Sequence, residues 1–240
     1  MTISSFCILG RALLSSLACW AAFAPSPGLA NDRPFQYART AVQEDDDQVW
    51  SFESWVQRFG SVRGLSFEPE YVFSPSTSLQ VELTRFADRR DEETGHEAEI
   101  EFKHVFNNIA RDGWGWGVSA ALSDERLNDG EHSTRSIGLK LPFSLSLWDG
   151  EGFLHLNAGV DKANDARRTW STSVGIEREV ARHTVLFAEL AHEGELKFGQ
   201  VGVRHWLKKE KLAIDFSLQQ QRSDGQRASG FLIGVGWYDL

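Results

Sequence analysis

The feature that most constrains this sequence is an alternation of apolar and polar residues that recurs from residue 49 onward. Between residues 96 and 106, apolar side chains occupy even positions and charged side chains odd ones: Ile100, Phe102 and Phe106 against Glu97, Glu99, Glu101 and Lys103. A period of two places the two sets on opposite faces of a β-strand. About twelve such segments of roughly ten residues follow one another. Their predicted bounds are 49–59, 64–73, 78–87, 96–106, 114–123, 134–147, 152–160, 169–180, 184–191, 196–207, 211–220 and 227–240.

Charge and hydropathy narrow the fold further. The chain has 240 residues and a formal net charge of −9, which disfavours nucleic-acid binding because phosphates attract basic surfaces. After residue 30, no apolar run reaches the roughly 20 residues that a spanning helix requires, so only a closed barrel would suit a membrane. Short turns, such as 74–77, alternate with longer charged loops, such as 88–95, as at the two ends of a membrane barrel. The sequence thus predicts an all-β fold, an antiparallel transmembrane β-barrel of about twelve strands. A soluble β-sandwich or barrel is the alternative.

The first 48 residues lie outside this pattern. An apolar run over 12–24, followed by Gly28-Leu29-Ala30, predicts a secretory signal peptide in residues 1–30, cleaved after Ala30. Lipoprotein processing at Cys19 is the competing prediction. Both cysteines of the chain lie in this segment, so the mature protein would have no disulfide. Residues 31–48 are polar and end in an acidic run, which predicts a periplasmic leader without fixed structure, followed by the barrel over 49–240.

Aromatic residues cluster at strand ends. With even connections on the periplasmic side, eight of them would form an interface girdle there: Trp50, Phe73, Phe106, Trp114, Trp148, Trp206, Trp237 and Tyr238. A thinner outer girdle would contain Phe59, Phe86 and Trp170. Amphipathic rings favour the boundary between lipid and water, so this clustering supports the membrane barrel.

The polar faces of the strands would line the lumen. The predicted lumen-lining residues are Glu53, Glu68, Glu70, Glu82, Glu97, Glu99, Glu101, Lys103, Lys140, Glu177, Arg204 and Asp215, with His155 on the same face. Because carboxylates predominate, one hypothesis is a narrow passive channel that favours cations and admits small solutes. The other is that acidic and basic side chains pair across the lumen, giving a filled barrel with a structural or surface-interaction role.

Catalytic motifs are sparse in this sequence. His132-Ser133, next to Glu131, is the nearest approach to a hydrolase pair, but strand neighbours point to opposite faces. An outer-membrane hydrolase is therefore a third, weaker hypothesis, and we predict that the protein is not an enzyme. No residue spacing indicates a metal site, and no cofactor is expected.

The closing stretch, Arg227–Leu240, alternates strictly and ends in Tyr238 and Leu240. It resembles the C-terminal signal of bacterial outer-membrane β-barrels, which the barrel assembly machinery reads. The whole layout resembles proteobacterial outer-membrane barrels of the uncharacterised or transporter type, including those linked to the meta-pathway of phenol degradation. The resembling features are Arg33-Pro34, Glu53-Ser54-Trp55, residues 113–117 and the closing stretch. The resemblance implies a Gram-negative outer-membrane location, contact with lipid, and passage of solutes or hydrophobic compounds. It supplies no catalytic residues.

Overall fold

The computed structural model describes residues 34–43, 48–90, 92–128, 133–164, 166–223, 225–238 and 240. The predictions for residues 1–30, cleavage after Ala30 and lipidation at Cys19, lie outside these ranges. Within them the chain forms twelve strands: β1 (Val49–Phe59), β2 (Val62–Ser74), β3 (Thr77–Asp88), β4 (Glu93–Val105), β5 (Trp114–Leu127), β6 (Ser133–Leu147), β7 (Gly152–Ala163), β8 (Thr169–Ala181), β9 (Thr184–Glu193), β10 (Leu196–Lys208), β11 (Leu212–Ser223) and β12 (Gln226–Trp237).

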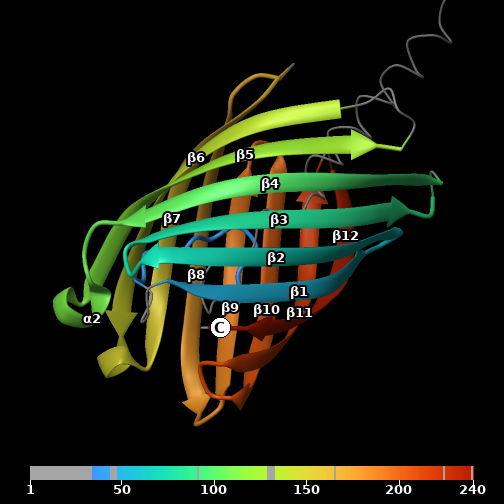
Figure 1. Cartoon of the computed structure of the whole chain (residues 1–240). Coiled ribbons are helices and arrows are strands. Elements are labelled where there is room, and N and C mark those ends of the chain that lie inside the picture. Colours follow the sequence, from blue (N-terminus) through green and yellow to red (C-terminus); the bar gives the residue numbers. More distant parts are fainter. Residues whose placement is uncertain are drawn as a thin grey trace, which may run out of the picture.

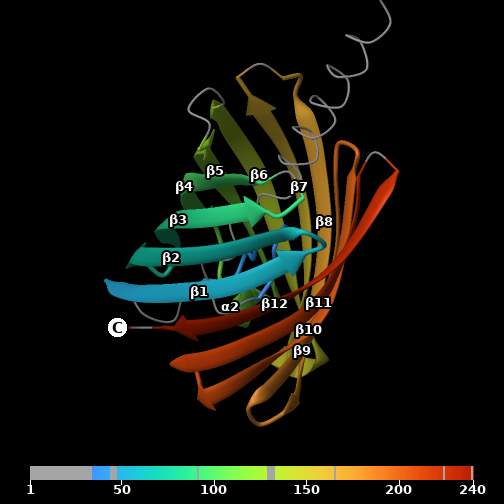
Figure 2. The same cartoon turned by 90° about the vertical axis from the view of Figure 1, so that its right-hand side faces the viewer.

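The twelve strands close into one barrel. Each strand pairs antiparallel with its neighbours in the chain, and β1 pairs with β12 from Phe52↔Trp237 to Phe59↔Gly230. The ring of strands is seen from two directions in Figure 1 and Figure 2. Closure leaves no strand edge unpaired. The predicted fold class, an antiparallel barrel of about twelve strands, is therefore confirmed.

The outer surface of the barrel is apolar and the inner surface is polar. On β4, Ile100 and Phe102 are 50% and 45% exposed, whereas Glu101 and Lys103 are 2% and 4% exposed. Large apolar side chains are exposed in this way on all twelve strands. A soluble fold would bury such a surface against itself. This distribution therefore excludes the soluble alternative and places the outer face against lipid.

Six of the eight residues predicted for the periplasmic girdle lie on the outer surface: Trp50, Phe73, Phe106, Trp114, Trp148 and Trp237. Trp206 and Tyr238 lie inside instead, 8% and 2% exposed. Trp206 comes two residues after the inward Arg204, so the period of two turns it inward as well. Tyr238 directly follows β12 and shares its parity with the buried Leu232 and Gly236, so the same period turns it inward.

The predicted outer girdle also needs correction. Phe59 and Phe86 are only 5% and 6% exposed and lie on the inward face, whereas Trp170 is 72% exposed. Phe59 shares its parity with Gln57, and Phe86 shares its parity with Thr84, both of which are buried. Phe59 and Phe86 thus point into the lumen near the ends of β1 and β3.

The two mouths of the barrel differ. We call the end where β1 begins and β12 ends the terminal mouth, and the other end the opposite mouth. The terminal mouth carries α2 (Ile109–Asp112), capped by Asn108 and ended by Gly113 at φ 76°, and η1 (Trp148–Gly150). Among the described residues, no helix is long and apolar enough to cross a membrane.

Candidate functional site

Residues 34–43 lie inside the barrel, and we call them the lumenal segment. It appears as the blue trace enclosed by the strands in Figure 1 and Figure 2. Phe35, Ala38, Arg39, Thr40 and Ala41 are each at most 1% exposed. The prediction that this part of residues 31–48 lacks fixed structure is therefore wrong. That prediction considered only the few apolar residues of the segment, and the barrel wall supplies the missing interactions.

Glu189 on β9 holds the bend of the lumenal segment. Its carboxylate accepts backbone N–H groups from Gln36 at 2.9 Å, Tyr37 at 2.7 Å and Ala38 at 2.5 Å. The side chain of Gln200 on β10 donates to the same carboxylate at 2.8 Å. A backbone without a sheet partner must find hydrogen bonds elsewhere when it is buried. Glu189 provides three of them from a single side chain.

Asn157 on β7 binds the backbone of Arg39 in both directions. The Arg39 N–H donates to Asn157 Oδ1 at 2.9 Å, and Asn157 Nδ2 donates to the Arg39 carbonyl at 3.0 Å. Further along the segment, the N–H of Ala41 donates to Ser144 Oγ at 2.8 Å. Gln43 then donates to Ser76 Oγ at 2.8 Å, in the turn between β2 and β3. The segment thus leaves the lumen at the terminal mouth.

Ser144, His155 and Glu177, on adjacent strands β6, β7 and β8, form a hydrogen-bonded row. Ser144 Oγ lies 2.8 Å from His155 Nδ1, and His155 Nε2 lies 3.2 Å from Glu177 Oε1. The order of hydroxyl, imidazole and carboxylate is the one that hydrolases use. Here the Ser144 hydroxyl accepts the N–H of Ala41, the ring of Phe35 packs 5.2 Å from the imidazole, and His155 is fully buried. In this state the row anchors the segment.

Two aromatic side chains of the segment fill separate pockets. The ring of Tyr37 packs 4.8 Å from that of Phe198, in a cluster with Phe59 and Leu196 close to the opposite mouth. Phe35 meets Phe187 edge to face, with ring centroids 6.0 Å apart. Among residues 34–43, Tyr37 therefore lies nearest the opposite mouth.

Glycines make room for the segment in the wall. A Cβ on Gly115 would lie 2.0 Å from the carbonyl oxygen of Ala41, and a Cβ on Gly175 would lie 3.0 Å from the ring of Phe35. Gly115 lies on the inward face of β5, and the lumenal segment passes directly over it.

Arg39 connects the segment to the acidic side of the lumen. Its Nε lies 3.0 and 2.7 Å from the two carboxylate oxygens of Glu101, and it also interacts electrostatically with Glu99 and Glu68. Both side chains of the Arg39–Glu101 pair are 2% exposed. The wall facing Arg39 belongs to β2, β3 and β4, where the predicted acidic residues are concentrated.

All twelve predicted lumen-lining residues lie on the inward faces of their strands. Nine are buried: Glu68, Glu70, Glu82, Glu101, Lys103, Lys140, Glu177, Arg204 and Asp215. Glu53, Glu97 and Glu99 are half-buried. The sequence analysis missed the residues that hold the segment, namely Glu189, Gln200, Asn157 and Ser144. Their parity along the strands was a usable indication, but nothing local marked them as partners of residues 34–43.

Arg204 organises a second cluster, beside the closure of the barrel. Its Nε and Nη2 donate to the two oxygens of Asp215 at 2.7 and 2.6 Å. Glu53 on β1 lies 3.5 Å away and accepts the hydroxyl of Tyr238. The guanidinium group lies 5.4 Å from the rings of both Trp206 and Tyr238. Trp206 and Tyr238, which were predicted for the girdle, thus pack against a cluster that links β1, β10 and β11 inside the barrel.

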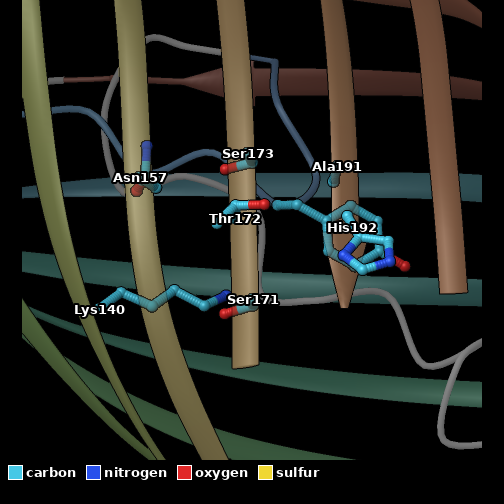
Figure 3. Close-up of a pocket in the computed structure, with 8 residues that line it drawn as sticks. Lys140, Asn157, Ser171, Thr172, Ser173, Ala191 and His192 are labelled. Carbon is cyan, nitrogen blue, oxygen red and sulfur yellow. The ribbon is translucent and has the colours of Figure 1, made fainter. Parts of the chain in front are cut away.

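Little space remains between the segment and the wall. A cavity of about 30 Å³ lies beside Arg39, Glu99 and Lys140, and one of about 10 Å³ lies beside Tyr37. Figure 3 shows the second, where Lys140 extends across to Ser171 of β8. A single water molecule needs about 10–15 Å³ of such space. The first cavity is therefore large enough for about two waters, and the second for about one.

The predicted hydrolase pair, His132-Ser133, lies partly outside the described residues. His132 lies outside them, and Ser133 begins β6 with its hydroxyl donating to Asp124 at 3.1 Å.

A closed barrel of twelve antiparallel strands, apolar outside and polar inside, is a transmembrane β-barrel of the bacterial outer-membrane type. Solved structures agree with this class. An outer-membrane channel from Pseudomonas putida superposes with a TM-score of 0.63 at 11% identity, covering 86% of this chain and 99% of that one. The KdgM porin in complex with disordered oligogalacturonate gives a TM-score of 0.58 at 11% identity, covering 79% and 99%. LpxR from Salmonella typhimurium gives 0.57 at 7% identity, covering 78% and 99%. No protein-family model and no curated sequence matches the chain.

Proposed function

We propose that this protein is a passive channel of the outer membrane for small polar solutes, held closed in the present state by the lumenal segment. The observation that carries the proposal is how the segment is held in the lumen. The lumen has a polar, charged wall, and the segment in it belongs to no strand and is bound through side chains such as Glu189, Asn157 and Glu101. A segment attached in this way can leave without breaking the sheet.

The charge of the lumen indicates which solutes would pass. Carboxylates outnumber basic side chains among its buried residues, and acidic rings favour cations. The KdgM porin was solved with oligogalacturonate, a polyanion that such a wall would repel. We therefore infer that this channel prefers cationic or neutral solutes.

A narrower assignment follows from the sequence resemblance alone. The resemblance to transporter-type barrels linked to the meta-pathway of phenol degradation supports, as part of this proposal, a role in the passage of small organic compounds. The aromatic cluster around Tyr37 and Phe198 offers a surface that such compounds could contact.

A filled barrel with a structural or surface-interaction role is the second candidate. It is favoured by the small size of the cavities, about 30 Å³ or less. The two candidates differ in whether the segment can be released.

Conductance in planar bilayers separates these two functions. We expect the full-length chain to conduct weakly, and a full-length variant with Tyr37→Ser and Arg39→Gln to conduct more strongly, because two of the contacts that hold the segment are lost. Its reversal potential should show a preference for cations. Arg135→Gln, which changes an arginine with a 72% exposed side chain, is the matched control and should behave as the unchanged protein. If the double variant remains a closed barrel but conducts no better, the structural role is favoured.

A further inference from the structure

We propose that the lumen is a binding site for arginine-containing peptides, and that the lumenal segment is its tethered occupant. This inference rests on the proposed channel function and names the class of solute that the channel admits.

Side chains of the barrel wall bind the backbone of the segment. Asn157 offers one acceptor and one donor to the N–H and carbonyl of a single residue, at 2.9 and 3.0 Å, as a neighbouring β-strand would. Ser144 accepts the N–H two residues later, and Glu189 accepts three N–H groups before it. None of these contacts depends on the side chains of the segment. Main-chain hydrogen bonds of this kind supply affinity that does not depend on the sequence of the peptide.

Alternate side chains of the segment enter separate pockets. Phe35 packs against Phe187, Tyr37 packs against Phe198, and Arg39 reaches Glu101. Because the backbone bends at Gln36 and Tyr37, these side chains reach pockets on different strands of the wall. The third pocket is the selective one, because an arginine Nε shared between both oxygens of a buried carboxylate cannot be replaced by a neutral group without loss.

The acidic wall has more carboxylate oxygens than Arg39 pairs with. Glu68, Glu82, Glu97 and Glu99 each keep a buried carboxylate oxygen without a hydrogen-bond partner among the described residues. Both terminal nitrogens of Arg39 are likewise buried without a partner there. Unsatisfied buried polar groups are destabilising and uncommon. A peptide with more cationic side chains than residues 34–43 would supply donors to these carboxylate oxygens.

The experiment uses the full-length Tyr37→Ser, Arg39→Gln variant, in which the tethered occupant is weakened but the wall is unchanged. The probes are the peptide Phe-Gln-Tyr-Ala-Arg-Thr-Ala, the same peptide with citrulline in place of arginine, and an unrelated heptapeptide with arginine at the same place. Affinity is measured by calorimetry in detergent. We expect both arginine peptides to bind, and the citrulline peptide to bind about ten- to a hundredfold more weakly.

The wall supplies a matched control. In a chain that also carries Glu101→Gln, the preference for arginine over citrulline should disappear, whereas Glu210→Gln, in an exposed turn, should leave it intact. Equal binding of arginine and citrulline peptides, or no binding to a variant that retains heat-dependent migration in SDS, would overturn the inference. A variant that conducts ions but binds no peptide refutes this inference and leaves the channel standing. Selective peptide binding by a barrel that does not conduct supports the inference and refutes the channel.

Discussion

Glu189 is the side chain on which the position of the lumenal segment depends most. Its two oxygens accept three successive backbone N–H groups and one side-chain amide. A hydrogen bond to an ionised group contributes more than one between neutral groups, and an amide side chain would offer one oxygen and add two donors against these N–H groups. Among the side chains compared, only a carboxylate accepts all four of these hydrogen bonds.

We predict that Glu189→Gln releases the lumenal segment more often while the barrel stays folded. Hydrogen bonds to charged groups are worth about 1.5–3 kcal/mol each, so the loss of even one should raise the frequency of open events about tenfold or more. Single-channel recording measures that frequency, with Glu210→Gln as the control. An unchanged frequency in Glu189→Gln would show that the segment is held by its other contacts.

Residue positions inside and outside the barrel were largely predictable, because parity within a strand is a local property. The outward prediction for Trp206 departed from this parity, because the inward prediction for Arg204 already determined the face of Trp206. Tyr238 is a second example, because it shares its parity with the buried Leu232 and Gly236. The lumenal segment is a different case. Gln36 and Glu189 are separated by 153 positions, and no periodicity within residues 31–48 identifies a partner so far along the chain.

At the scale of elements, each of the twelve predicted segments corresponds to one observed strand. Polar turn residues and charged loops mark where each alternation stops, so the ends differ by only a few positions. The helix α2 was missed because its single turn lies within 107–113, a stretch predicted only as a connection, and depends on the cap of Asn108. Short capped turns leave no repeating pattern that a sequence can show.

The lipid-facing register of the strands gives a prediction of its own. Ile233, in the middle of β12 between Val56 and Phe216, is 50% exposed. A lysine there would lie near the bilayer midplane and should lower the free energy of unfolding by about 2–4 kcal/mol. Leu207→Lys, near the end of β10 on the same outward face, should lower it by about 0–1 kcal/mol.

Denaturant unfolding in lipid vesicles measures both variants. Equal losses for Ile233→Lys and Leu207→Lys would mean that the two positions share one environment, contrary to a membrane belt that ends at the interface.

For the whole molecule, closure between β1 and β12 sets the response to detergent. A barrel without an open edge offers no strand from which unravelling can begin. We predict that the unboiled protein migrates differently from the boiled protein in SDS electrophoresis, and that it is recovered with outer membranes. Recovery in a soluble fraction, with one band position before and after heating, would contradict the transmembrane barrel.

The enclosed segment also constrains how the molecule is assembled. Its partners lie on β4, β6, β7, β9 and β10, and these strands face one another across the lumen only once β12 has joined β1. Contacts between distant parts of a chain form late, because the loop between them must first be closed. Until then Phe35, Tyr37 and Arg39 have neither their pockets nor their hydrogen bonds. Among the described residues, those nearest the amino terminus are therefore among the last to reach their native place.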